Sequence, residues 1–503
     1  MVQCRKCMQL FTVALLAASG CVSASHAQQA PPTPSAASQH LDAILGAQDG
    51  AWAPAQLHVM AQLRDAALRD PYALDQLRYL TDNIGPRLSG SPQALQAVHY
   101  VADQMRALGA KVTLEKAMVP HWVRGEETAE LVSWSGQTTG TTQKIVLTAL
   151  GGSVATPAGG LTAPVVVVDD WQQLRSLPDG AVRGKILLFN HPFDKQLAAE
   201  DKGMQAYGQA VAYRAMAPAA GEAVGAVAVL VRSVGGADYR LPHTGMTDYA
   251  PDLPKIPAAA VTAEDADLLQ VLAGQGPVTL HLTLTPQTLP DVPGYNVIAD
   301  WPGSEHPEQV VIVSGHLDSW DLGTGAIDDG AGVAVSMQVI HLMQALGIHP
   351  RRTIRFVAWM SEEEASQGAA AYLADHKNTV AEHIGALESD GGAGHPAGIY
   401  FAGPPELAAW LQPVAQVLAP FGATLLEGVG GTGEDIAGLT QQGVPSFAPI
   451  QDSRFYFNYH HTAADTLDKV NPRELEENAA VMSILAFALA DSAAPAPRAH
   501  PRP

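Results

Sequence analysis

The chain has 503 residues, of which 47% are hydrophobic, and carries a formal net charge of -21. At roughly 150 residues per domain, this length predicts about two to four domains, and the charge excludes a nucleic-acid partner, which needs a basic surface. All three cysteines lie before residue 27. The mature chain is therefore expected to have no disulfide, no cysteine nucleophile and no cysteine-bound metal.

The first 27 residues predict an export signal. Arg5 and Lys6 precede the apolar run LFTVALLAA, which is too short to cross a bilayer, and residues 25–27 (SHA) offer a cleavage site. Cleavage before Cys21 would attach a lipid instead, although the preceding residues lack the usual leucine. We expect a periplasmic or extracellular protein with no transmembrane segment, and a lipid-anchored envelope protein is the lesser alternative.

The next part of the chain divides by composition. Residues 28–56 are rich in Ala, Pro, Ser and Gln, which predicts a flexible lead or propeptide. Residues 57–108 have helical periodicity. Residues 122–290 contain short β-branched runs separated by turn residues, with two helical patterns, and predict an inserted β-rich domain. Because this segment has few clustered histidines or acids, we expect the catalytic residues to lie outside it.

From Gly294 onward, strand, loop and helix patterns alternate. This alternation predicts an α/β domain with a doubly wound, mostly parallel sheet. We expect the catalytic domain to comprise residues 57–121 and 291–493, followed by a flexible tail over 494–503.

Chelating side chains follow the predicted ends of several strands. They are His316, Asp318, Asp328, Asp329, Glu362, Glu363, Glu364, Asp390, His460 and His461. Ligands of doubly wound sheets gather beyond the carboxyl ends of the strands, so these side chains are expected to converge. Mixed imidazole and carboxylate donors favour zinc, and the surplus of acids favours two cations bridged by a carboxylate.

Such a metal pair predicts a hydrolase. Zinc lowers the pKa of bound water to about 7, and a neighbouring carboxylate can carry the proton to a leaving amine. Glu362 and Glu363 can divide metal binding and proton transfer, because adjacent side chains at a strand end point apart. The serine-hydrolase motif G-x-S-x-G and the zinc motif H-E-x-x-H are both absent from the sequence.

Several motifs occur in a characteristic order: GHLDSWD, GAIDDGAG, SEEE, LESD, GTGEDI and HHTAADT. Together they resemble the dizinc exopeptidases related to aminopeptidase Y and glutamate carboxypeptidase. VRGKILLFN and KIPAAAVTAEDADLL resemble the protease-associated insertion of that family. The resemblance implies a phosphorylase/hydrolase-like peptidase fold, small peptide substrates with free ends, two zinc ions and a homodimer.

The resemblance also implies residue functions. Glu362 would be the general base, and Asp318 would orient His316 from outside the ligand shell. Asp328 would bridge the two zinc ions. The complete ligand set would be His316, Asp328, Glu363, Asp390 and His461.

Other side chains have competing interpretations. Asp329 is a turn residue or a brace for the loop, and Glu364 is expected to be a surface charge. His243 is an ordinary loop histidine or reaches the substrate cleft. Arg87 and Arg454 bind a substrate carboxylate or form salt bridges.

The sequence does not decide whether the enzyme removes residues from the amino end or the carboxyl end of a peptide. Recognition of a free amine needs an acid near the cleft, and recognition of a free carboxylate needs a cation. An aminopeptidase of the same family is therefore the main alternative to a carboxypeptidase or dipeptidase. A non-catalytic binding homologue and a glutaminyl cyclase with one zinc are the remaining alternatives. The inserted segment is expected to influence substrate choice and to leave the ligand set intact.

Overall fold

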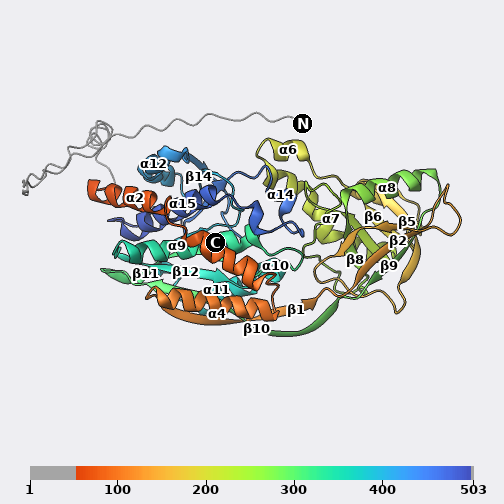
Figure 1. Ribbon diagram of the computed structural model, residues 1–503, viewed down its shortest axis with the longest axis horizontal. Coiled ribbons are helices and arrows are strands. Elements are labelled where there is room, and N and C mark those ends of the chain that lie inside the picture. Colours follow the sequence, from red (N-terminus) through yellow and green to blue (C-terminus); the bar gives the residue numbers. More distant parts are fainter. Residues whose placement is uncertain (1–51, 500–503) are drawn as a thin grey trace, which may run out of the picture. The chain divides into compact units, whose positions relative to one another are not determined.

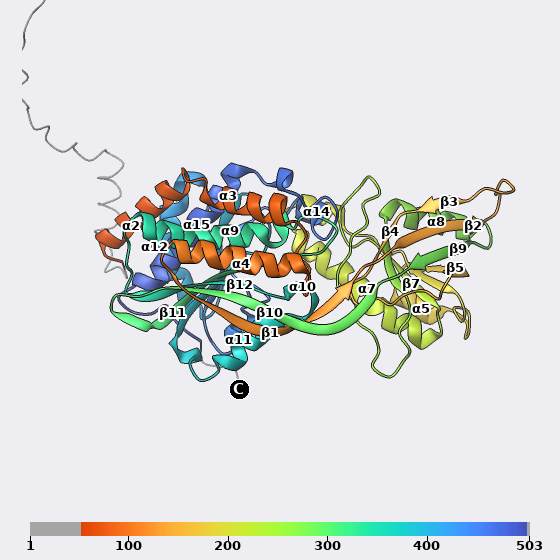
Figure 2. The ribbon, with the colours of Figure 1, turned by 60° about the horizontal axis from the view of Figure 1, so that its bottom comes forward.

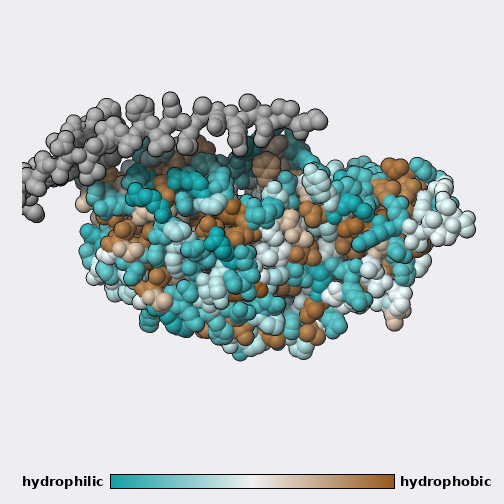
Figure 3. Space-filling view, in the orientation of Figure 1, coloured by the Kyte–Doolittle hydropathy of each residue, from teal (hydrophilic) through white to brown (hydrophobic). Residues whose placement is uncertain are grey.

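The computed structural model describes residues 52–499, which contain two eight-stranded sheets (Figure 1). The predicted export signal, the lipidation position and most of the predicted lead lie outside the described residues. Between residues 52 and 499, no helix combines the length and the apolar character that a membrane crossing requires. On the face drawn in Figure 3, small hydrophobic groups are scattered between hydrophilic ones.

The first sheet is mixed. Its order is β1 (Lys111–Val123), β10 (Gln287–Trp301), β12 (Arg352–Trp359), β11 (His306–His316), β13 (His383–Glu388), β16 (Ser446–Gln451), β14 (Pro396–Ala402) and β15 (Leu425–Gly428). The central strands β12, β11, β13 and β16 are parallel, whereas β1, β10 and β14 join by antiparallel pairing. The predicted parallel sheet is thus present at the centre, with antiparallel strands on both sides.

Helices cover both faces of this sheet. Helices α9 (Ala331–Ala345) and α15 (Pro472–Asp491) pack on one face, and α11 (Gln367–Asp375) packs on the other (Figure 2). Helix α13 (Ala437–Gln441) packs beside α11. Burial on both faces explains why β11 contains the continuous apolar run VVIV. Helix α9 is buried on almost every side, in keeping with its apolar sequence.

The helical periodicity near the start of the described chain is confirmed. It corresponds to α2 (Pro54–Ala67), α3 (Tyr72–Arg78) and α4 (Pro92–Ala107). Ser91 caps α4 by accepting a hydrogen bond from the backbone N–H of Ala94, and Pro92 occupies the first helical position. The remaining helices of the first sheet are α10 (Glu362–Ala365), α12 (Glu406–Leu418) and α14 (Tyr456–Tyr459).

The second sheet lies within residues 127–284. Its order is β3 (Gln143–Ile145), β2 (Glu127–Ser133), β9 (Thr279–Leu284), β5 (Leu161–Val168), β6 (Ile186–Phe189), β7 (Ala228–Arg232), β8 (Ala258–Val261) and β4 (Leu147–Ala149). Its helices are α5 (Trp171–Ser176), α6 (Lys195–Ala199), α7 (Gly203–Val224) and α8 (Ala263–Gln275). The β-branched runs and the two longer helical patterns of this segment occur where the sequence predicts them.

A long two-stranded ribbon connects the sheets. Strands β1 and β10 pair from Lys111 and Asp300 to Val123 and Gln287, and β2 and β9 continue the pairing (Figure 2). The sequence patterns predict no strand over residues 111–121. The reason is that β1 is largely half-buried or exposed, so its sequence lacks a clear apolar alternation.

Candidate metal centre

The carboxyl ends of the central parallel strands meet at one place. His316 is the last residue of β11, Glu362 opens α10 just after β12, and Asp390 follows β13. His461 follows α14, which lies beyond β16. The predicted convergence of these side chains rests on the shared direction of the strands, and the structure shows it.

Two groups of donors face the two oxygens of Asp328. On one side, the Nε2 atom of His316 lies 3.2 Å from Asp328 Oδ1 and 3.5 Å from Asp390 Oδ1. On the other side, the Nε2 atom of His461 lies 3.2 Å from Asp328 Oδ2 and 2.9 Å from Glu363 Oε2. This is the arrangement that a carboxylate bridging two cations requires.

The chemistry of the donors fits metal ions. Asp328 Oδ2 is buried and has no hydrogen-bond partner among residues 52–499. Burial raises the pKa of Glu363 to about 7, because ionising this carboxylate without a counter-charge is costly. Burial acts on Asp328 too, but His460, His316 and His461 outweigh it and hold its pKa well below the usual value. Cations between these groups would stabilise all the carboxylates in their ionised form.

Glu362 and Glu363 differ in their surroundings. The side chain of Glu363 is 2% exposed and contacts His461, whereas that of Glu362 is 18% exposed. Glu362 Oε2 lies 3.9 Å from His316 Nε2, so it is beside the centre but less enclosed. Burial is the main cause that raises the pKa of Glu362 well above its ordinary value. The two carboxylates are therefore placed for different tasks.

Asp318 contacts His316 through its main chain. The Nδ1 atom of His316 lies 3.0 Å from the carbonyl oxygen of Asp318, and the Asp318 carboxylate is 4.0 Å away. That carboxylate instead accepts hydrogen bonds from the backbone N–H groups of Ser361 and Glu362 and from the Ser89 hydroxyl. Asp318 thus links the orientation of His316 to the start of α10.

The loop after His316 is held by Asp329. Its carboxylate accepts hydrogen bonds of 3.0 Å from the backbone N–H groups of His316 and Gly332, which is the bracing interpretation made from the sequence. A side chain at Gly332 would meet the carbonyl oxygen of Ser389 at 1.7 Å. The glycine is therefore required by the close approach of two backbone segments.

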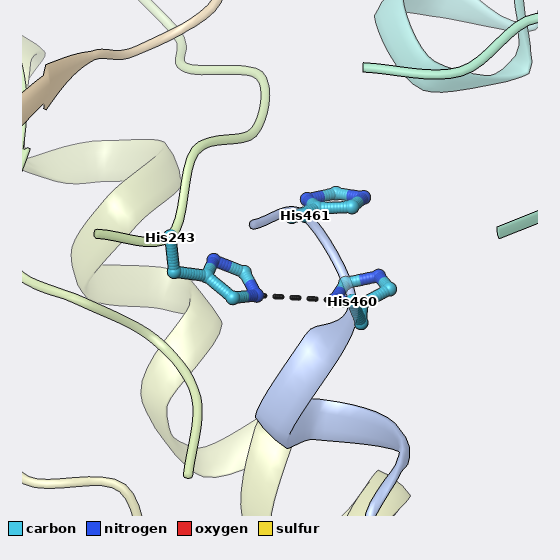
Figure 4. Close-up of side chains that lie close together, drawn as sticks. All are labelled: His243, His460 and His461. Atoms are coloured by element: carbon cyan, nitrogen blue, oxygen red, sulfur yellow. Dashed lines mark hydrogen bonds between the residues drawn. The ribbon is translucent and has the colours of Figure 1, made fainter. Parts of the chain in front are cut away.

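The second sheet also reaches this centre. The loop between β7 and β8 places His243 beside His460 and His461 (Figure 4). His243 Nε2 lies 3.0 Å from His460 Nδ1, and Thr244 lies next to His461, with its carbonyl oxygen 3.3 Å from His461 Nδ1. The proposed ligands and Glu362 all lie outside residues 122–290, as expected, but this loop of the segment contacts two histidines at the centre. Of the two interpretations of His243, the structure favours the one in which it reaches the site.

Comparisons with known proteins agree with this arrangement. Residues 296–486 match the model of peptidase family M28. The chain is 36% identical to carboxypeptidase Q from Mus musculus over 419 residues, which cover 83% of this chain and 85% of the relative. The chain belongs to peptidase family M28. Membership of this family, together with such relatives, identifies the chain as a metallo-exopeptidase.

Two solved structures show the same fold. The peptidase M28 precursor from Shewanella amazonensis SB2B superimposes with a TM-score of 0.82 at 36% identity, covering 89% of this chain and 98% of that one. A zinc aminopeptidase from Bacillus subtilis gives a TM-score of 0.60 at 19% identity, covering 86% of this chain and 98% of that one. At this lower identity, the likeness concerns the fold alone.

One acidic side chain of this M28 peptidase lies where the sequence did not place it. Glu364 was expected to be a surface charge, and this expectation is wrong because Glu364 is only 5% exposed. The short helix α10 turns it inward, and burial, followed by the charges of Asp318 and Glu363, raises its pKa to about 9. Glu364 is thus a buried acid beside the metal centre.

Neither nominated arginine is free to bind a substrate carboxylate. Arg87 is fully buried and donates hydrogen bonds to the carbonyl oxygens of Gly85, Leu317, Thr324 and Gly325. It therefore holds the backbone of the loop that precedes Asp328. Arg454 is exposed and paired with Asp452, which is the salt-bridge interpretation.

Asp465 supports the loop before Asp328, a role that the sequence patterns did not predict. Its carboxylate accepts hydrogen bonds of 2.8 and 2.7 Å from the backbone N–H groups of Ala326 and Ile327, just before Asp328. Burial raises its pKa to about 7. In the sequence, this role could have been suspected from the position of Asp465 in the motif HHTAADT, four residues after His461.

Proposed function

We propose that this chain is an exported dizinc exopeptidase of the carboxypeptidase Q type, which hydrolyses dipeptides or short peptides with free ends. The main support is the pair of donor groups that share Asp328. Two separate groups on the two oxygens of one carboxylate suit two cations better than the single zinc of a glutaminyl cyclase. The presence of Glu362 beside them favours a catalyst over a non-catalytic binding homologue.

In this proposal, His316 and Asp390 would hold one zinc ion, and Glu363 and His461 would hold the other. Asp328 would contribute one carboxylate oxygen to each group of ligands. Mixed nitrogen and oxygen donors are typical of zinc, and the related fold from Bacillus subtilis is described as a zinc aminopeptidase. Zinc bound here would supply a Lewis acid that polarises the scissile carbonyl and makes water acidic enough to attack at neutral pH.

Glu362 performs the proton transfers in this proposal. Its carboxylate lies beside the centre and is less enclosed than that of Glu363, so it can reach an attacking water. It takes the proton from that water and passes it to the amine that leaves. Asp318 and Asp329 act indirectly. Asp329 binds the backbone N–H of His316, and Asp318 contacts the His316 ring and the backbone N–H of Glu362.

An aminopeptidase is a second candidate, and Asp435 supports it. Asp435 is 5% exposed, and neither of its carboxylate oxygens has a hydrogen-bond partner within residues 52–499. Burial raises the pKa of Glu362, and the charge of Asp435 adds to this effect, which indicates that the two are neighbours. An unpartnered carboxylate near the general base is suited to hold the free amino group of a substrate.

Metal analysis together with assays on four forms of one dipeptide tests both candidates. The dipeptide is offered free, blocked at its amino end, blocked at its carboxyl end, and blocked at both. Two zinc ions per chain and cleavage of the free form support the dizinc exopeptidase. Loss of cleavage only after blocking the amino end selects the aminopeptidase. One zinc ion per chain, or no cleavage of any form, contradicts the proposal.

The residues of the second sheet are proposed to form a protease-associated-like inserted domain. The resemblance of its motifs to such insertions supports this assignment, as does the position of the whole sheet within residues 127–284. Since His243 and Thr244 contact the proposed site, the insert contributes to the catalytic surroundings as well as to substrate choice.

A further inference from the structure

Three imidazoles meet where the second sheet contacts the metal centre. His243, His460 and His461 each place a nitrogen within 4.8 Å of the other two (Figure 4). All three are buried. The proposed zinc ligands include only His461, so the hydrogen-bonded pair of His243 and His460 has no function in the reaction described so far.

The hydrogen-bond partners of His243 indicate which of its nitrogens carries the proton. A neutral imidazole has one N–H donor and one acceptor nitrogen. His243 Nδ1 is buried and has no partner among the described residues, whereas Nε2 lies 3.0 Å from His460 Nδ1. A buried N–H without an acceptor is rarer than an acceptor without a donor. The proton is therefore on Nε2, and His243 donates to His460.

This donation determines the state of His460 as well. Its Nδ1 atom accepts from His243, so its own proton is on Nε2. That Nε2 atom lies 3.4 Å from Asp328 Oδ2, the oxygen without a hydrogen-bond partner among residues 52–499. The opposite assignment would place a nitrogen lone pair against a carboxylate oxygen. These two atoms are not hydrogen-bonded, so the tautomer of His460 follows from its contact with His243, and the 3.4 Å distance shows only that its Nε2 atom faces the metal centre.

We propose that His243 is a positioning residue that holds His460 with its Nε2–H directed into the metal centre. There the N–H of His460 donates to the carbonyl oxygen of the scissile peptide bond as negative charge develops on it. A donor fixed in advance at such a position stabilises the transition state more than the bound substrate. This inference rests on the proposed peptidase function, and it makes a loop of the second sheet part of the catalytic machinery.

The same three histidines do not favour a further metal ion. The rings of His460 and His461 are stacked 3.6 Å apart at an angle of 15°, so their nitrogens point side by side and do not converge. The guanidinium group of Arg214 lies 3.4 Å from His461 Nδ1 and would repel a cation there. We therefore expect two metal ions per chain, and a third would overturn the inference.

A pair of substitutions at His243 tests the hydrogen bond. His243→Gln places an amide N–H near the position of Nε2, whereas His243→Leu has similar volume and no donor. We expect His243→Leu to lower kcat about tenfold, or about 1.4 kcal/mol, with KM and metal content unchanged. His243→Gln should keep kcat within about threefold of the unsubstituted chain. Equal losses in the two variants, or a loss confined to KM, would overturn the inference.

A double-mutant cycle separates positioning from a purely structural role. His460→Gln supplies an amide N–H near the Nε2 position, and this donor does not depend on a tautomer. In that background, His243→Leu should cost less than about twofold in kcat, because the two residues act through one hydrogen bond. The same tenfold loss in both backgrounds would show that His243 acts in another way and would overturn the inference.

Nitrogen NMR of the histidine side chains gives a readout that is independent of activity. In the full-length, zinc-loaded protein, the spectra should show the proton of His460 on Nε2, with that of His243 also on Nε2. A proton on Nδ1 of His460 would overturn the inference. If the unsubstituted chain cleaves no dipeptide but shows this protonation pattern, the proposed function fails while the hydrogen-bonded pair is upheld.

Discussion

The two sheets contribute to the metal centre in different ways. The first sheet supplies the proposed ligands from the ends of its parallel strands, where His316 and Asp390 lie. The second sheet supplies none of the proposed ligands, but its loop at His243 and Thr244 contacts the imidazoles of His460 and His461. Strand ends thus provide the reactive groups, and a distant loop provides the groups that orient them.

The largest effect is expected when the shared carboxylate of the first sheet is removed. Asp328→Ala should lose both metal ions together, because one residue serves both donor groups. Turnover should fall by more than about 10⁴-fold, beyond the range for loss of a general base alone. Metal analysis and kcat measurements check this. Retention of two zinc ions would contradict the bridging assignment.

A smaller effect is expected from the general base. Glu362→Gln should lower kcat by about 10²–10⁴-fold, because the amide cannot accept the proton of the attacking water. Metal content should stay near that of the unsubstituted chain, since Glu362 is outside the proposed ligand set. Glu363→Gln is the matched control and should lose metal as well as turnover. Near-normal turnover of Glu362→Gln would remove the basis for the assignment.

The contact between the sheets can be weakened at Arg124. Its guanidinium group lies 2.8 Å from an Asp321 carboxylate oxygen, 2.8 Å from the Thr148 hydroxyl and 3.3 Å from the Thr244 hydroxyl. Arg124→Met should cost about 3 kcal/mol in unfolding free energy, because the carboxylate loses its buried partner. It should also lower kcat severalfold through the loop at Thr244. Urea unfolding and kinetics measure the two effects.

Arg124→Lys provides the control for this contact. It keeps the positive charge but loses the planar fork that contacts three partners at once. We expect an intermediate loss of stability and of kcat. A stability loss with unchanged kcat in both variants would show that the second sheet does not need a firm contact to orient the imidazoles.

The smallest effect on turnover is expected at the opposite end of the first sheet. His383 opens β13, and its Nε2 atom lies 2.8 Å from the Tyr372 hydroxyl, while its Nδ1 atom lies 3.1 Å from the Thr379 carbonyl oxygen. Burial lowers its pKa to about 4, so the folded chain takes up a proton less readily than the unfolded chain, whose pKa is near the ordinary 6.5. Stability is then full above about pH 6.5 and is lost as the pH falls toward about 4.

The effect of His383 on stability can be measured as a difference in unfolding free energy between two pH values. At pH 5, the histidine should cost about 2 kcal/mol of unfolding free energy relative to pH 7.5, by the usual value per pKa unit. His383→Gln should remove that pH dependence and leave kcat within about twofold at pH 7.5. Urea unfolding at the two pH values checks the first part. A large loss of turnover would contradict the view that chemistry is confined to the carboxyl ends of the strands.

The convergence of the proposed ligands could be predicted because these residues follow strands. Apolar runs such as VVIV before His316 identify buried strands, and the carboxyl ends of parallel strands share one edge. The edge strands were harder to predict. Strand β1 is largely half-buried or exposed, and the range assigned to the insert began inside it at residue 122.

Burial and long-range contact could not be predicted for single residues. Glu364 resembles a surface charge in the run SEEE, and only the turn of α10 shows that it faces inward. From the sequence, Arg87 could bind a substrate carboxylate or form a salt bridge. Its carbonyl partners are set by the fold around it.

From local patterns alone, the amino-acid sequence specifies the alternation of strands and helices, the order of the motifs and the set of chelating side chains. The contact of His243 with His460 is a different matter, because 217 positions separate them along the chain. No periodicity or spacing encodes such a contact. It arises when both sheets are folded and packed, since burial then brings the two imidazoles together and leaves His243 Nε2 and His460 Nδ1 to hydrogen-bond each other.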